Sequence, residues 1–141
     1  MGASEGSLNV YYIDASFPQA VRQAIASVRD DVLYAGGPNA LAEDTLDDKW
    51  LPHAGANDWV VIHRDKKIRK RPTERQALLD SGVRTFCLTG SGNYTRWDTL
   101  RLLVARWPDI ERIADQRAGP YIEGVTWQGI RPLFIPGVAA V

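Results

Sequence analysis

The chain contains little of what stabilises secreted proteins or anchors proteins in membranes. Cys87 is the single cysteine, which excludes a disulfide within the chain, and its apolar surroundings in VRTFCLTG predict a buried core residue. No stretch approaches the roughly 20 consecutive apolar residues of a membrane-spanning helix, so we expect no membrane association. The start, MGASEGSLN, has neither the charged nor the apolar region of a secretory signal. These features predict a cytoplasmic protein.

The sequence also lacks an excess of charge of either sign. Its 17 lysines and arginines balance 17 aspartates and glutamates, so attraction to a polyanion would have to come from a local basic patch. With 141 residues, of which 45% are hydrophobic, the chain is large enough to bury one apolar core. We expect a single domain over residues 9–141, preceded by a flexible lead over residues 1–8.

Strand patterns and helix patterns alternate along the chain. Short apolar runs rich in β-branched and aromatic residues predict buried strands at 9–14, 31–37, 59–63 and 83–90. Helical spacing of apolar residues predicts helices at 16–30, 46–57, 72–82, 95–107 and 108–117. The tail at 119–137 contains enough glycine and proline to predict only an edge strand or a hairpin. The alternation predicts an α/β fold, a three-layer α/β/α sandwich with a central, mostly parallel sheet.

Some helix boundaries can be predicted from single residues. Thr73 and Gln76 match a capping box, and Gly82 suits the position that ends the same helix. Pro108 is expected to start a new helix. One face of the helix before it is expected to carry Trp97, Leu100, Leu103, Val104 and Trp107.

Acidic residues follow the predicted strands at the points where those strands end. Asp14 ends the first strand and Asp65 comes two residues after the third. In a parallel sheet both carboxylates belong to the carboxyl edge, where ligands gather. Asp47 and its neighbour Asp48 lie at the start of the second helix, which returns to that edge. Converging carboxylates repel one another unless a cation lies among them, and oxygen-only ligation suits Mg²⁺ or Mn²⁺.

Each acid also has a purely structural interpretation. Asp14 or Ser16 could cap the first helix, Asp47 could cap the second, and Asp65 could begin a turn. His63 is interpreted as a polar residue at a strand end rather than as a general base or a ligand. Both interpretations of the acids stay open from the residues alone.

Basic residues surround Asp65, and two interpretations of them are open. The cations are Arg64, Lys66, Lys67, Arg69, Lys70 and Arg71. They could hold a polyanionic strand by charge, or they could form a solvated turn before the next helix. Tyr94, Trp97 and Trp50 could stack bases near that edge, although helical spacing favours a core position for both tryptophans.

The order of these motifs resembles that of the PIN-like nuclease domains, in particular the small VapC-type toxins of prokaryotes. The matching features are a strand ending in Asp before a proline-started helix (YYIDASFP), an Asp followed by apolar residues at helical spacing (Asp47, Trp50, Leu51, Ala54), and a strand with a following acid (WVVIHRD). The resemblance covers residues 9 to 107 and rests on the order of short motifs.

The resemblance implies a metal-dependent ribonuclease. Asp14, Asp47 and Asp65 match the acidic positions, which in this family hold Mg²⁺ or Mn²⁺, with Asp48 as an adjacent substitute. The fourth acidic position corresponds to Asn93 or Asp98, although Asp98 fits equally as the partner of Thr95 in a helix cap. The resemblance also implies RNA as substrate, an antitoxin protein as partner and a homodimer.

Two departures from the family pattern bear on activity. Many relatives carry a second acid directly after the first, where this chain has Ala15, and Thr or Ser two residues before the last acid, where it has His63. These departures favour, as the alternative, a catalytically impaired module that binds nucleic acid or a protein. A phosphoacceptor receiver domain is disfavoured because Thr89, Gly90 and Ser91 offer no lysine after the fourth strand.

Overall fold

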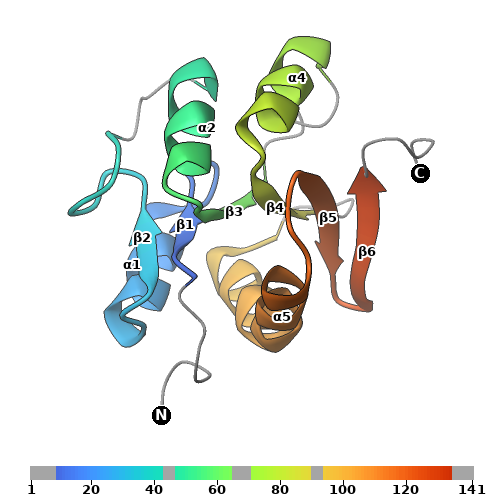
Figure 1. Ribbon diagram of the computed structural model, residues 1–141. Helices are drawn as coiled ribbons and strands as arrows, with labels where there is room; N and C mark the ends of the chain where they lie inside the picture. Colours follow the sequence, from blue (N-terminus) through green and yellow to red (C-terminus); the bar gives the residue numbers. More distant parts are fainter. Residues whose placement is uncertain (1–8, 43–46, 65–70, 90–93, 135–141) are drawn as a thin grey trace.

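The computed structural model describes residues 9–42, 47–64, 71–89 and 94–134 (Figure 1). A six-stranded sheet runs through it in the order β2-β1-β3-β4-β5-β6, with β1 to β5 parallel and β6 antiparallel to β5. The strands are β1 (Tyr11–Ile13), β2 (Val32–Tyr34), β3 (Val60–His63), β4 (Arg84–Leu88), β5 (Tyr121–Thr126) and β6 (Gly129–Phe134). The helices are α1 (Gln19–Val28), α2 (Asp47–Ala56), α4 (Pro72–Ser81) and α5 (Arg96–Gln116). None of these helices is long and apolar enough to cross a membrane.

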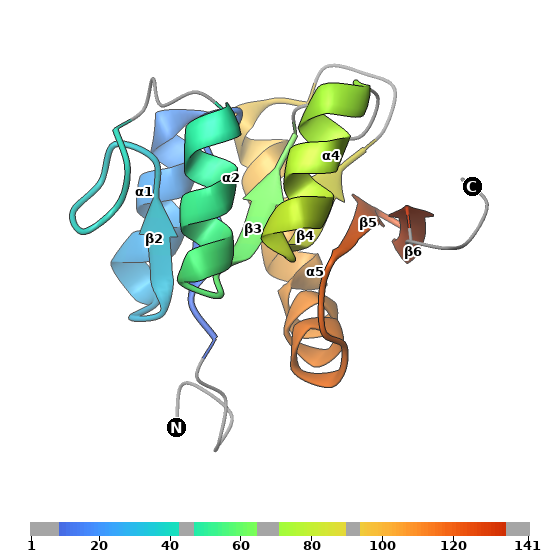
Figure 2. The same cartoon turned by 45° about the horizontal axis from the view of Figure 1, so that its top comes forward.

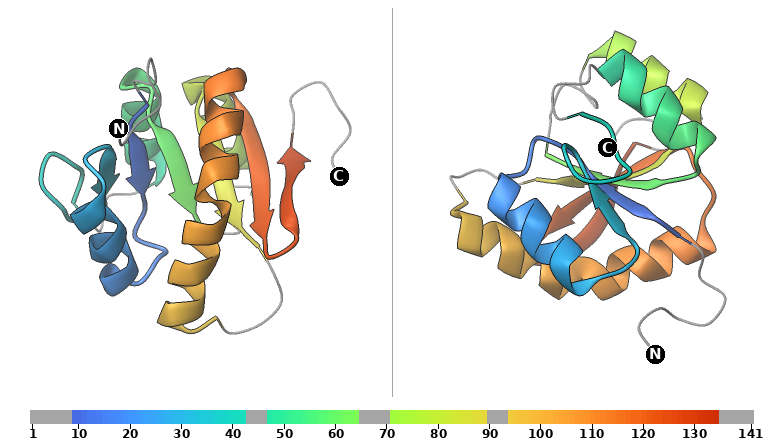
Figure 3. Two further views of the ribbon diagram at one scale, coloured as in Figure 1. Left: turned by 90° about the horizontal axis from the view of Figure 1, so that it is seen from below. Right: turned by 90° about the vertical axis from the view of Figure 1, so that its left-hand side faces the viewer.

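The helices cover both faces of the sheet, which confirms the predicted three-layer architecture. Helices α2 and α4 lie side by side on one face, and α1 and α5 lie on the other (Figures 1 and 3). Successive side chains of β1 enter the two cores in turn: Tyr11 and Ile13 pack with α1 and α5, whereas Tyr12 packs with α2 and α4. The ring of Tyr12 stacks on Trp59 with 5.1 Å between centroids. Both faces are therefore buried, as the continuous apolar runs predicted.

Gly55 sets how closely α2 approaches α4. A Cβ atom at this position would lie 2.1 Å from the backbone oxygen of Ser81, closer than real Cβ contacts. The C-terminal end of α2 is also joined to β3, because Trp59 N–H donates to Ala54 O at 2.9 Å. The position of α2 over the sheet thus depends on a glycine at residue 55.

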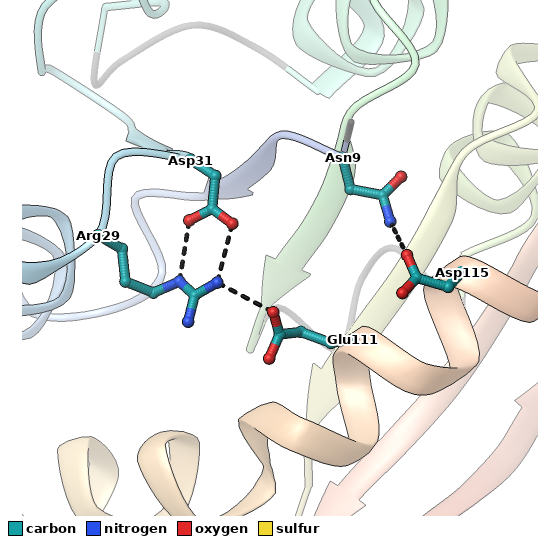
Figure 4. Close-up of polar contacts among 5 residues, drawn as sticks. All are labelled: Asn9, Arg29, Asp31, Glu111 and Asp115. Atoms are coloured by element: carbon teal, nitrogen blue, oxygen red, sulfur yellow. Dashed lines mark hydrogen bonds and ion pairs between the residues drawn. The ribbon is translucent and has the colours of Figure 1, made fainter. Parts of the chain in front are cut away.

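Polar contacts hold α1 against α5 (Figure 4). Arg29 binds Asp31 through two hydrogen bonds of 2.8 Å and reaches Glu111 of α5 at 3.0 Å. A second contact joins the start of the described chain to α5, where Asn9 donates to Asp115 at 2.7 Å. All are interactions of partly exposed groups, so the apolar seam beneath them dominates the energy of this contact.

At the amino edge of the sheet, a buried arginine forms hydrogen bonds to three segments of the chain. Arg84, which is 8% exposed, donates to Asn9 Oδ1, to Ala114 O and to Asp58 O at 2.8–3.0 Å. These acceptors belong to the segment before β1, to α5 and to the turn before β3. One guanidinium therefore satisfies several carbonyl and amide oxygens that would otherwise be desolvated without partners.

Most predicted elements are present, and the first four strands and the cap at Gly82 are confirmed. Gly82 has the left-handed φ of 69° that ends α4, and its N–H donates to Leu79 O. The predicted capping box of Thr73 is wrong. Helix α4 begins at Pro72 with Arg71 at the N-cap position and no side-chain cap bond, because proline suits the first helical position. Thr73 consequently lies inside the helix.

The predicted helix break at Pro108 is also wrong, because α5 continues from Arg96 to Gln116. Pro108 cannot donate to the carbonyl of Val104, but both residues are exposed, so water can satisfy that carbonyl. The buried seam of Leu103, Trp107 and Ile110 runs across the proline without interruption. Burial along the seam outweighs the local cost of proline.

The tail forms the predicted hairpin, in which β5 and β6 pair antiparallel, but β5 is not an edge strand. Residues 121–125 of β5 are buried, and β5 is an interior strand that pairs in parallel with β4. Only β6 is the predicted edge strand, and it contains Pro132, whose missing N–H is tolerated at an edge. Gly124 has a packing role, because a Cβ there would meet the side chain of Leu133 at about 3.0 Å.

A buried carboxylate lies on β5. Glu123 is 3% exposed and pairs with Arg117 at 3.2 Å between Oε1 and Nη1. Burial raises the pKa of the Glu123 carboxyl, and Arg117 opposes that shift only in part. The folded protein therefore holds a proton on Glu123 more strongly than the unfolded chain does.

We expect Gly55→Ala to destabilise the protein by about 1–3 kcal/mol, because the new methyl group forces α2 away from Ser81 O. The measurement is the free energy of unfolding from chemical denaturation, with Ala56→Ser at the neighbouring exposed position as control. An unchanged unfolding midpoint in Gly55→Ala would show that the two helices do not pack as described.

We expect Glu123→Gln to change how stability depends on pH. The pKa of Glu123 is raised above its ordinary 4.5 in the folded state, so its contribution is present below that value and is lost as the pH rises through the raised pKa. The variant removes this loss and should gain stability relative to wild type as the pH rises above about 4.5, the ordinary pKa of the carboxyl. The measurement is the free energy of unfolding of both proteins by chemical denaturation at several pH values. The same pH dependence for wild type and variant would contradict this expectation.

Candidate active site

The carboxyl edge of the parallel strands is where the loops and the helix starts meet. Each helix follows a parallel strand and runs back beside it, so α1, α2, α4 and α5 all begin at this edge (Figure 2). Helix starts carry partial positive charge and open N–H groups, which favour anions. The fold therefore concentrates both acids from strand ends and anion-attracting helix ends in one place.

Asp14 is the best-defined side chain at this edge. It directly follows β1, is 7% exposed, and its N–H continues the sheet by donating to Ile62 O at 3.1 Å. Its Oδ1 accepts hydrogen bonds from the backbone N–H of Ser16, at 3.1 Å, and from the Ser16 hydroxyl. The carboxylate is thus fixed in orientation by residues of its own loop.

Ser16 connects the ends of β1 and β3. Its Oγ accepts a hydrogen bond from the backbone N–H of Arg64 at 2.8 Å while it donates to Asp14. The N-cap position of α1 is occupied by Pro18, without a side-chain cap bond. The alternative that Asp14 or Ser16 caps this helix is therefore wrong, because Ser16 is used to join the two strand ends.

Arg64 extends from this junction towards the start of α5. Its guanidinium carbon lies 5.8 Å from the ring centroid of Tyr94, within the range of a cation–π contact. The Tyr94 hydroxyl in turn donates to Thr89 O, after β4, at 3.3 Å. Arg64 is thus placed beside Asp14, on the strand end that leads to Asp65.

Arg22 supports the same edge from inside the fold. This α1 residue is 2% exposed and donates from Nε to Phe17 O at 2.9 Å and from Nη1 to Ala35 O. It therefore joins the loop after β1 to the loop after β2. This role was not predicted from the sequence. The sequence did contain an indication of it, because Arg22 falls on the buried side of α1 together with Val21 and Ile25.

The structure locates the other predicted acids to different degrees. Helix α2 begins at Asp47, so the backbone of Asp47 and Asp48 is at the carboxyl edge. Their side chains, together with Asp65, Asn93, Lys66, Lys67, Arg69 and Lys70, lie outside the described residues. Their roles stay predictions.

Asp98 is engaged in a helix cap. Its N–H donates to Thr95 Oγ1 at 3.0 Å and its Oδ1 accepts from Arg101 at 2.8 Å, which confirms the predicted capping arrangement. The hydrogen bond from Arg101, followed by that of Thr95, lowers the pKa of the Asp98 carboxyl. Arg71 is the N-cap residue of α4, with Nη1 3.7 Å from Glu74 Oε1.

His63 and Ala15, the two departures from the expected motifs, differ in burial. His63 ends β3, is fully buried, and is in register with Cys87 on β4. Continuing the β1–β3 register places it beside Asp14 on the face covered by α2 and α4. Ala15 is exposed. A buried imidazole thus takes the position next to Asp14 at this edge.

The two tryptophans that were predicted to lie in the core differ in burial. Trp50 is buried, as expected, whereas Trp97 is 66% exposed and Val104 on the same helix is 61% exposed. Helix α5 buries the side defined by Leu102, Leu103 and Ile110, and Trp97 falls outside it. The core position predicted for Trp97 is therefore wrong.

A divalent cation at this edge is compatible with the donors present. Asp14 offers a carboxylate oriented by Ser16, and carboxylate oxygens are the ligands that Mg²⁺ and Mn²⁺ prefer. Within the described ranges, however, no three histidine, cysteine or acidic side chains form a metal-binding group. A ligand set would need side chains from residues beyond those ranges.

The comparisons with known proteins agree with this architecture. The model of the family described as PIN like domain matches residues 10–90, which is more than half of the chain, so the chain belongs to this family. A curated protein of Mycobacterium tuberculosis, "Putative ribonuclease VapC45", is 36% identical over 47 residues. The match covers 33% of this chain and 34% of that protein, so the chain spans about a third of the relative's length. No solved structure matches the chain.

We expect Ser16→Ala to lower the free energy of unfolding by about 1 kcal/mol, because it removes the partner of Arg64 N–H and a donor to Asp14. Ser27→Ala is the matched control, since the Ser27 hydroxyl makes only a local bond to Ala24 O at an exposed position. Chemical denaturation of both variants measures the difference. Equal, small effects would mean that Ser16 does not join the strand ends.

Proposed function

We propose that the protein is a metal-dependent ribonuclease that hydrolyses RNA phosphodiester bonds. The observation that carries this proposal is the Asp14 carboxylate, held by Ser16 at the carboxyl edge of a PIN-like sheet. The ribonuclease name of the M. tuberculosis relative supports the same activity.

The cation would be held by Asp14, Asp47 and Asp65, with Asp48 as the adjacent substitute for Asp47. When bound, Mg²⁺ or Mn²⁺ supplies Lewis-acid activation of the scissile phosphate and of the attacking water. Two features of the described residues support this assignment: α2 begins at Asp47 at the same edge, and Gly55 fixes the approach of that helix.

The protein's own residues would orient the RNA. Arg64 is placed over Tyr94 beside Asp14 and can bind a phosphate oxygen, while the basic segment that follows it would hold the rest of the strand by charge. Ser16 keeps the carboxylate directed towards the edge. Arg22 keeps the two flanking loops in position.

A second candidate function is a PIN-like module that binds nucleic acid or a protein partner without cleaving. Ala15 favours it, because the acid that many relatives place after the first aspartate is absent from this chain. Such a module would bind RNA in a salt-sensitive way and would be indifferent to divalent ions.

The family resemblance adds a biological role to the leading proposal. A ribonuclease of this type would be the toxin of a toxin–antitoxin pair, with a cognate antitoxin as its protein partner and with a homodimer as its assembly. The expected compartment is the cytoplasm, where its RNA substrate is present.

We expect Asp14→Asn and Asp65→Asn each to reduce Mg²⁺- or Mn²⁺-dependent cleavage of a labelled RNA at least about a hundredfold, because metal activation contributes several kcal/mol. Thermal stabilisation of the wild type by the same ions should disappear in both variants. Asp80→Asn is the control, since Asp80 is an exposed residue of α4 that accepts a bond from Gln76. RNA binding without cleavage under all these ions would instead establish the binding module.

A further inference from the structure

A hollow opens between the start of α1 and the start of α5. Its volume is about 380 Å³, within the roughly 300–1,000 Å³ range of small-ligand sites. The lining residues are Ala20, Val21, Thr95, Arg96, Trp97 and Leu100. One wall is thus a tryptophan and an arginine from the first turn of α5, and the other wall consists of small and aliphatic side chains of α1.

Trp97 is exposed where its helical spacing predicted burial. With 66% of its surface accessible, its indole contributes little to the core and is available to contact a ligand in the hollow. Its flat face can accept any nucleobase, because stacking does not depend on base identity.

A chain of side-chain contacts leads from Asp14, at the carboxyl edge, to the start of α5. Asp14 is bonded to Ser16, Ser16 to the N–H of Arg64, and the Arg64 guanidinium lies over Tyr94. Tyr94 directly precedes the residues of α5 that line the hollow. A strand bound at Asp14 would therefore reach the hollow within a short distance.

Charge around the start of α5 favours a polyanion. Arg96 lines the hollow, Arg64 lies over Tyr94, and Arg101 lies over Trp127 at 5.1 Å from the ring centroid. The acid in this group, Asp98, is paired with Arg101 at 2.8 Å. Trp127 is itself 37% exposed, so a second arginine–aromatic pair continues the same surface.

We propose that the hollow binds one nucleobase of single-stranded RNA, stacked on Trp97, with Arg96 contacting the adjacent phosphate. This rests on the proposed function for its substrate class, but it concerns side chains other than the carboxylates of the candidate site. Arg96 and the exposed indole of Trp97 together supply the two contacts that single-stranded nucleic acid needs, a positive charge for a phosphate and a flat ring for a base.

The first measurement is the affinity of a short fluorescein-labelled single-stranded RNA by fluorescence anisotropy, in the Asp14→Asn background so that the probe stays intact. Trp97→Ala should weaken binding about tenfold, because each stacked base contributes that much or more. Trp97→Phe should retain most of the affinity. Val104→Ala is the matched control, since it removes another exposed apolar side chain of α5.

Inorganic polyphosphate is the second probe, because it has the charge of RNA without bases. Its affinity should be unchanged by Trp97→Ala and weakened by Arg96→Gln. An equal loss for both probes in Trp97→Ala would overturn the stacking role. Unchanged RNA affinity in Trp97→Ala would overturn the proposal as well, and loss of self-association by sedimentation in that variant would assign the surface to a second copy of the chain.

The two proposals fail in different measurements. Absence of metal-dependent cleavage by the wild type would remove the nuclease function, whereas the binding assay does not depend on cleavage. Normal cleavage and binding by Trp97→Ala would remove the base site alone.

Discussion

The pairing of β1 with β3 determines where Asp14, Ser16 and Arg64 of the candidate site lie. Only three residues form β1, yet the strand is buried on both faces and hydrogen-bonded to a neighbour on each side. The ladder continues one residue further, through Asp14 N–H and Ile62 O, and Ser16 then fixes Arg64 to the same junction. If this register slipped by one residue, Asp14 would turn to the opposite face of the sheet. The sheet therefore sets the position of the Asp14 backbone, and Ser16 sets the orientation of its carboxylate.

The two edges of the sheet carry different kinds of polar group. At the amino edge, Arg84 satisfies backbone oxygens and an amide from three separate segments, which stabilises the fold. At the carboxyl edge, Arg22 performs a comparable task, but Asp14 and Arg64 there are held in place by groups that leave them beside the surface. This division is usual for open parallel sheets, where ligands bind beyond the carboxyl ends of strands.

The sequence was sufficient for the strands because parallel strands buried on both faces form continuous apolar runs. It failed where tertiary packing outweighed a local rule. Pro108 looked like a helix start, but the buried seam continued through it with the proline exposed to water. The tail looked weak because of Gly124 and Pro132, yet Gly124 is needed for close contact with Leu133. These effects depend on neighbours far away in the sequence.

The same limits apply to the candidate site. The place of Asp14 at the carboxyl edge could be predicted, because an acid that follows a buried strand can be recognised from neighbouring residues alone. The role of Ser16 could not, since its partner Arg64 is 48 residues away in the chain. Trp97 was assigned to the core from its spacing alone, and the error arose because a helix that packs on one side only leaves part of an apolar stripe exposed.

The short β2 strand and the proline in β6 also affect how the molecule meets other chains. Unpaired strand edges invite aggregation, because another chain can extend the sheet by backbone pairing. Here one lateral strand has three residues, and the other contains Pro132, which cannot donate to a new ladder. Both lateral strands are therefore poor partners for a further strand. Association between copies of the protein would accordingly use side-chain surfaces, and it would remain reversible because it does not extend the sheet.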